Sequence, residues 1–173
     1  MTASSVSSQS RADASDRRER TLAMVAGVLG LVMFLLGFLR WLEIGDGDAQ
    51  QKFSGFAWGM PTTAVIGFSL AAGVIALLGT TARRDDRGAP SAVPTPSAVP
   101  TGLAATGLLL AVGIYLGKGG ISPDLGDEVG VEIGLILGLV TALAQTIVLG
   151  MGLASRRNNN TEHDHTDRPR PSA

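Results

Sequence analysis

Four long runs without a charged residue constrain this chain more than any other feature of its sequence. They cover residues 22–39, 62–82, 101–117 and 133–154. A helix of about 20 apolar residues crosses the hydrocarbon core of a bilayer, and about 17 is the lower limit. Backbone groups cannot stay unpaired in lipid, so each run should be helical. The runs also lack the regularly spaced polar residues of a soluble amphipathic helix. They predict an all-α integral membrane protein, a bundle of four transmembrane helices.

The basic residues fall mainly on one side of this predicted membrane. Of 14 Lys and Arg, 11 lie before the first run, between the second and third, or after the fourth. Cytoplasmic segments of membrane proteins carry an excess of Lys and Arg. We therefore expect a multi-pass protein of the plasma membrane with both termini in the cytoplasm. The connections 40–61 and 118–132 should then face outward. Trp41, Trp58 and Tyr115 should lie at the outer interface, where amphipathic rings are enriched.

The segments beyond the runs are polar and lack an apolar period. Residues 1–20 and 155–173 are predicted to be disordered cytoplasmic tails, and residues 83–100 a Pro-rich cytoplasmic linker. The chain has no cysteine, which excludes disulfides and thiolate metal sites. His163 and His165 lie in the second tail without a fixed geometry, so we expect no metal and no other cofactor. The net charge of −1 argues against a nucleic-acid partner.

The predicted spans lack the ionisable and catalytic residues that chemistry within the membrane would need. No ionisable residue lies near the centre of a predicted span, whereas ion pathways and coupled transport usually need such groups. The candidate for an intramembrane carboxylate is Glu132, which we interpret as an interfacial group in contact with water. No HExxH motif, Ser–His couple or phosphate-binding loop is present. The sequence therefore predicts that the chain is not an enzyme.

Small residues recur at every fourth position from residue 130, just before the last run, to the end of that run at residue 154. We call this pattern the small-residue row: Gly130, Gly134, Gly138, Ala142, Thr146, Gly150 and Ala154. Four residues turn a helix about 40° past a full turn, so the row drifts around the helix and cannot face one straight partner. Its first part should let one backbone approach closely, and its last part should meet another. We therefore expect the fourth helix to be central in the bundle.

Gln145 lies near the middle of the same run. A buried amide should find a hydrogen-bond partner across the helix interface, worth on the order of 0.6–2 kcal/mol. Candidates within the chain are the hydroxyls of Ser69, Thr106 and Thr146. The alternative is a polar contact with a partner protein or a lipid headgroup.

Two stretches carry a resemblance to a known family. They are "GDGDAQQKFSGFAWGMP" at residues 45–61, and the last span with Gln145 among small residues. In these parts the chain resembles the actinobacterial four-span membrane proteins that include the mycobacterial 34 kDa antigen, over roughly residues 21–155. Members of that family carry a long Pro/Gly/Gln-rich C-terminal tail, whereas the tail here is short and charged. The resemblance implies an envelope or division-associated membrane protein, with no assigned enzymatic activity and no catalytic residues to transfer.

These patterns together favour a non-enzymatic membrane protein that acts as a small scaffold or accessory subunit of an envelope complex. Its expected partners are membrane lipid and other membrane proteins or further copies of itself. The alternative is a small transporter or channel without intramembrane charges. A holin-like pore is a third interpretation, which the long linker and the well-bounded outer segments favour less.

Overall fold

The computed structural model describes residues 3–45, 51–57, 59–82, 98–117 and 129–166. Within these ranges the helices are α1 (Ala3–Leu36), α2 (Met60–Ala82), α3 (Ala98–Gly117) and α4 (Ile133–Thr166). Each contains a span long and apolar enough to cross a membrane: Arg17–Leu36, Met60–Thr80, Ala98–Gly117 and Ile133–Ser155. This confirms the predicted set of four helices that are long and apolar enough to cross a membrane.

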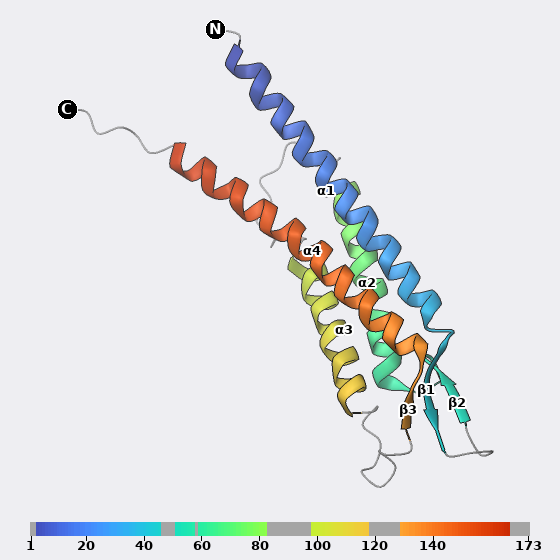
Figure 1. The fold of residues 1–173 in the computed structure, drawn as a ribbon. Coiled ribbons are helices and arrows are strands. Elements are labelled where there is room, and N and C mark those ends of the chain that lie inside the picture. Colours follow the sequence, from blue (N-terminus) through green and yellow to red (C-terminus); the bar gives the residue numbers. More distant parts are fainter. Residues whose placement is uncertain (1–2, 46–50, 58, 83–97, 118–128, 167–173) are drawn as a thin grey trace.

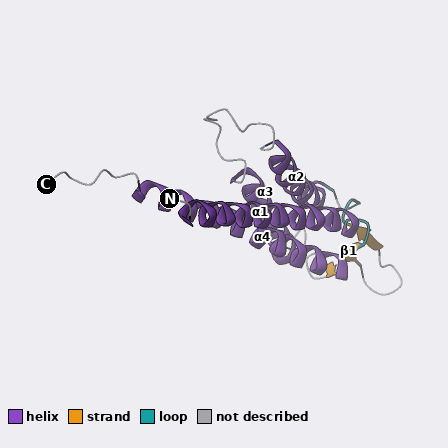
Figure 2. Ribbon diagram, turned by 90° about the horizontal axis from the view of Figure 1, so that it is seen from above, coloured by secondary structure: helices purple, strands orange, loops and turns teal. Residues whose placement is uncertain are grey.

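The helices form a closed ring of neighbours. α1 packs against α2 and α4, and α3 packs against the same two helices (Figure 1). α4 therefore has α1 and α3 as its main neighbours, which differs from the predicted central position. The prediction relied on the whole small-residue row, but Gly150 and Ala154 at its end do not pack against a neighbouring helix, as described below. Seen from above, the long α1 and α4 lie next to each other, with β1 at the end away from the chain termini (Figure 2).

A three-stranded antiparallel sheet closes one end of the bundle, so the all-α prediction was wrong for the two outer connections. The strands β1 (Arg40–Ile44), β2 (Gln51–Ser54) and β3 (Val129–Val131) lie in the order β2-β1-β3. Glu43 of β1 pairs with Lys52 of β2 and with Gly130 of β3. The helices bring both connections to the same end of the bundle, where pairing satisfies their backbone groups.

The first and last helices extend well beyond the apolar runs. α1 includes residues 3–20 and α4 continues to Thr166, so the predicted disorder of residues 1–20 and 155–173 differs from the structure wherever residues are described. A helix already nucleated by an apolar span elongates at little further cost. Most of the predicted linker, residues 83–97, lies outside the described residues.

The buried side chains form two clusters along the bundle axis. The larger one, at the sheet end, includes Met33, Trp41, Leu42, Val65, Ile66, Ala111, Ile114, Leu135 and Ala142. The smaller one, toward the opposite end, is mostly alanine and consists of Ala26, Ala72, Ala104 and Leu149. Large apolar side chains such as Val28, Leu109 and Val140 are exposed on the outside of the bundle. Such an apolar exterior suits a helix bundle surrounded by lipid.

Candidate functional site

Gln145 is the polar centre of the bundle. Its side chain is 0% exposed. Its Nε2 atom donates one hydrogen bond to the carbonyl oxygen of Ala26 on α1, at 3.0 Å, and another to the carbonyl oxygen of Ser69 on α2, at 2.8 Å. The hydroxyl of Ser69 donates to Oε1 of Gln145. Both N–H groups and the oxygen of the amide are thus engaged, and one side chain of α4 joins two other helices.

Two glycines make room for this amide. A Cβ atom added at Gly30 of α1 would lie 2.9 Å from the carbonyl oxygen of Ser69 and 3.3 Å from Nε2 of Gln145. One added at Gly73 of α2 would lie 3.0 Å from the carbonyl oxygen of Ala26 and 3.5 Å from the same nitrogen. Close approach of the backbones of α1 and α2 therefore brings both carbonyl acceptors within reach of Gln145.

Among the three hydroxyls considered for Gln145, the structure places Ser69 against it. Thr106 instead donates to the carbonyl oxygen of Gly102 in its own helix, and Thr146 donates to that of Ala142. Hydroxyls in apolar helices commonly bond to the preceding turn in this way. The two main-chain acceptors, on Ala26 and Ser69, could not be predicted from the sequence. Every residue has a main-chain carbonyl oxygen, so the residue type does not show which oxygen lies within reach of Gln145.

The first part of the small-residue row packs around Trp41. The indole is 0% exposed, and its Nε1 atom donates to the carbonyl oxygen of Leu36 at 2.8 Å. A Cβ atom at Gly134 would lie 2.6 Å from Cδ1 of the indole, and one at Gly138 would lie 3.1 Å from its Cη2 atom. Gly130 is not part of the helical row, because it lies in β3 and faces Glu43. The close approach is thus to the strand β1 and its tryptophan.

The last part of the small-residue row has no close neighbour. Ala142 is buried, but a Cβ atom at Gly150 would meet nothing within 4 Å, and Ala154 is exposed. The 40° drift of a four-residue step carries these positions away from the adjacent helices. Gly150 and Ala154 therefore do not make the predicted second contact, whereas Thr146 is half-buried.

The aromatic residues divide between core and surface. Trp41 was predicted to sit in an interfacial ring, but it is buried inside the protein. It can be buried because Gly55, Gly134 and Gly138 leave space for a large ring, and because Leu36 accepts its N–H. Tyr115 is 47% exposed, and Trp58 lies outside the described residues.

Three charged side chains meet at the sheet. Lys52 Nζ lies 3.1 Å from Oε2 of Glu43 and 3.2 Å from Oε1 of Glu132. The pKa of Lys52 is raised, first by its hydrogen bond to Glu43 and then by that to Glu132. The pKa of Glu132 is lowered by its side-chain hydrogen bonds, first with Glu43 and then with Lys52. Glu132 is therefore a partly exposed member of an ion-pair cluster outside the spans. Its partial exposure is compatible with the predicted carboxylate in contact with water.

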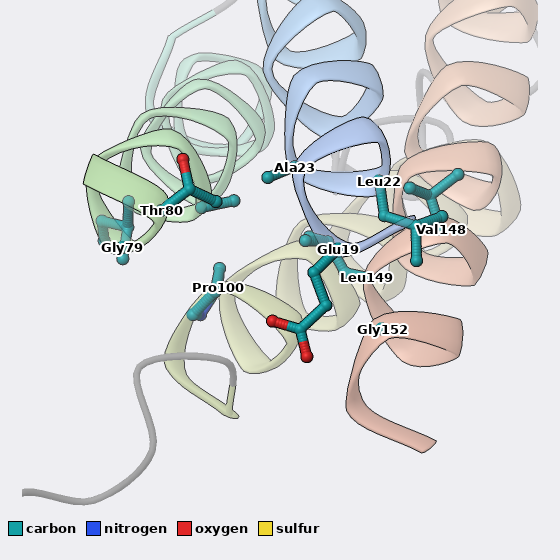
Figure 3. Close-up of a pocket in the computed structure, with 11 residues that line it drawn as sticks. Glu19, Leu22, Ala23, Gly79, Thr80, Pro100, Val148, Leu149 and Gly152 are labelled. Carbon is teal, nitrogen blue, oxygen red and sulfur yellow. The ribbon is translucent and has the colours of Figure 1, made fainter. Parts of the chain in front are cut away.

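The opposite end of the bundle holds a cavity of about 50 Å³ (Figure 3). It is lined by all four helices and contains one carboxyl side chain, that of Glu19. The sequence pattern places Glu19 in a tail predicted to be disordered, so it is not among the predicted site residues. Its spacing from Leu22 and Ala23, three and four residues on, would have placed it on their face of a continuing helix.

The described residues contain no group of three or more His, Asp or Glu side chains arranged to hold a metal ion. The side chains of His163 and His165, and the acidic residues Asp46 and Asp48, lie outside the described part of the chain. In comparisons with known proteins, no family model, curated protein or solved structure matches this chain.

Proposed function

We propose that this chain is a non-enzymatic integral membrane protein that serves as a small scaffold or accessory subunit of a cell-envelope or division-associated complex. In this proposal it lies in the plasma membrane with both termini in the cytoplasm and the sheet outside. The distribution of Lys and Arg supports that orientation. The resemblance to the actinobacterial four-span membrane proteins supports the association with the envelope.

The observation that carries the proposal is the complete internal use of Gln145. A transport pathway through the bundle needs polar groups that can exchange bonds with a substrate or with water. At the centre of the described spans, both N–H groups of Gln145 bond to main-chain oxygens, and its oxygen accepts from Ser69. Thr141, another buried polar residue of α4, donates to the carbonyl oxygen of Leu137 in its own helix at 2.8 Å. These contacts favour a structural role.

A second observation concerns the surface that remains for partners. Trp41 and the glycines around it pack against one another within the chain, and this packing attaches the sheet to α4. A partner must therefore contact the lipid-facing sides of the helices, the outer sheet or the cytoplasmic extensions. A rigid outer sheet on a fixed bundle presents a defined surface on one side of the membrane, as a scaffold requires.

Cross-linking in native membranes, followed by purification in a mild detergent, tests this proposal. We expect the tagged full-length protein to be recovered with one reproducible membrane partner or as a homo-oligomer of fixed size. Recovery as a lone monomer at several cross-linker lengths would refute the scaffold role.

Flux measurements in proteoliposomes test the alternative. We expect no protein-dependent movement of protons, metal cations or small organic solutes. Flux that is present in the native chain and lost in Gln145→Leu would establish a transporter or channel instead.

A further inference from the structure

Three arginines at the start of the first candidate span are exposed and unpaired. Arg17, Arg18 and Arg20 lie in the first turn of the span Arg17–Leu36. Both ion pairs formed among the described residues belong to Lys52, so neither involves these arginines. A guanidinium group keeps its charge across the physiological pH range. This end of α1 therefore presents positive charge that no ion pair within the described part of the chain neutralises.

The acidic residues of the same helix are placed differently. Glu19 lines the cavity, and it is separated from Arg17 by about 160° around the helix. Asp13 and Asp16 precede Arg17, so they lie farther from the apolar run. The arginines are thus the charged residues of α1 that lie beside the apolar run on its outward side.

The face of α1 that carries Arg17 continues into the span as an exposed apolar surface. We call this surface the α1 stripe, and it consists of Met24, Val28, Leu31 and Leu35. At about 100° per residue, all four lie within about 40° of Arg17 around the helix, and Arg20 lies about 60° from it. α1 packs against α2 and α4 through its other side, where Ala26 and Met33 are buried.

The arginines and the stripe together have the dimensions of a phospholipid in one leaflet. The rise from Arg20 to Leu31 is about 16 Å, and one leaflet contributes about 15 Å to the hydrocarbon core. Arg17 and Arg20 therefore lie at the level of lipid phosphates when the stripe lies along acyl chains. A guanidinium can bind a phosphate through two parallel N–H donors. A headgroup without an ammonium leaves the phosphate charge uncompensated, so unpaired arginines favour an anionic lipid over a zwitterionic one.

We propose that this face of α1 binds an anionic phospholipid of the adjacent leaflet. Its phosphate lies on Arg17 and Arg20, and one acyl chain follows Met24, Val28 and Leu31. The site rests on the proposed insertion of the chain in a membrane, but it does not depend on the scaffold role. The lipid would fix the depth and rotation of α1, because it holds one side of the helix at the phosphate level.

The test uses the full-length chain in phosphatidylcholine nanodiscs that contain a small share of phosphatidylglycerol with a diazirine on its acyl chain. We expect saturable labelling of the α1 stripe at Met24, Val28 and Leu31, located by mass spectrometry. Unlabelled phosphatidylglycerol should compete about tenfold or more better than phosphatidylethanolamine, since each arginine near the phosphates contributes about fivefold. Soluble glycerol phosphate should not compete, because it lacks the chain that the stripe contacts.

Matched charge variants separate a site from general attraction to anionic lipid. Arg17→Gln combined with Arg20→Gln should weaken competition by phosphatidylglycerol about tenfold or more. Arg168→Gln combined with Arg170→Gln removes the same charge from the C-terminal tail and should leave competition unchanged. Equal weakening by both pairs, or equal labelling of exposed residues of α3 such as Leu109, would overturn the proposal.

Two further outcomes identify which part of the reasoning fails. Competition by glycerol phosphate as strong as that by phosphatidylglycerol would show an anion site without an acyl chain and overturn the choice of a lipid. Failure of the chain to insert into the nanodiscs would refute the proposed membrane location, and this site with it. Insertion without a preference for phosphatidylglycerol over phosphatidylethanolamine would refute the site alone.

Discussion

Alanine substitutions at two glycines of the small-residue row should have opposite effects on stability. At Gly134 the new methyl group would meet the carbonyl oxygen of Arg40 and lie 2.6 Å from the indole of Trp41. At Gly150 it would meet nothing within 4 Å. Both glycines belong to the same row of α4, and the substitution is chemically identical. The difference between the two changes in stability should therefore come from the surroundings of each glycine.

The expected size follows from two opposing terms. Overpacking a filled site costs about 1–3 kcal/mol. Replacing Gly by Ala inside a helix gains about 0.8–1 kcal/mol. Gly134 is in the first turn of α4, where little of that gain applies, and its neighbours are a main-chain oxygen and a fully buried ring. We expect Gly134→Ala to lower the free energy of unfolding by about 1–2 kcal/mol, and Gly150→Ala to raise it by up to about 1 kcal/mol.

Denaturant unfolding of the full chain in mixed micelles measures both values. Tryptophan fluorescence is a suitable probe, because Trp41 is buried at the site of the first substitution. The native chain and both variants are compared in the same lipid and detergent mixture. If Gly134→Ala is as stable as the native chain, or if the two variants shift in the same direction, then the row does not pack against β1 as described.

Three further outcomes are expected. Gln145→Leu and Ser69→Ala should each lower stability, and a double-mutant cycle between them should show coupling of about 0.5–1.5 kcal/mol; additive effects would exclude their hydrogen bond. Trp41→Phe should cost about 1–3 kcal/mol through the lost N–H bond and the smaller ring, measured by thermal unfolding; a stability equal to that of the native chain would mean that the indole is not buried. The lowered pKa of Glu132 gives stability that is present above its ordinary value of 4.5 and is lost as the pH falls through the lower folded value. The raised pKa of Lys52 gives stability that is present below 10.5 and is lost as the pH rises through the higher folded value. A pH titration of sheet stability, followed by near-ultraviolet circular dichroism, should therefore be flat between these limits, and a transition near neutral pH would contradict the ion-pair cluster.

The helices could be predicted from sequence because the property that defines them is local. An uninterrupted apolar run of sufficient length indicates a spanning helix whatever its neighbours are. The need of Gln145 for a partner was also local, because a buried amide must be satisfied wherever it lies. Ser69 could be named only as one of several hydroxyls, since the choice depends on which helices are adjacent.

The sheet and the cavity could not be predicted, because they depend on contacts between distant segments. β1 and β3 are more than 80 residues apart, and neither has the length or alternation that identifies a strand. Trp41 resembles an interfacial tryptophan until Gly134 and Gly138 are known to face it. Glu19 was missed because the first run was taken to begin at its first uncharged residue, whereas α1 and its apolar span continue through Glu19.

The hydrogen bonds of Gln145 to main-chain oxygens have a consequence for how this protein can change over evolution. An acceptor in the backbone survives almost any mutation of its own residue, so Ala26 can be exchanged without removing the oxygen that it supplies. Selection would then act on α1 through size alone, by keeping Gly30 and its neighbours small. Among diverged homologues, substitutions at Gln145 and Ser69 should therefore occur together. The hydrogen bond from Gln145 to the main chain of Ala26 should produce no correlated substitutions between those two positions.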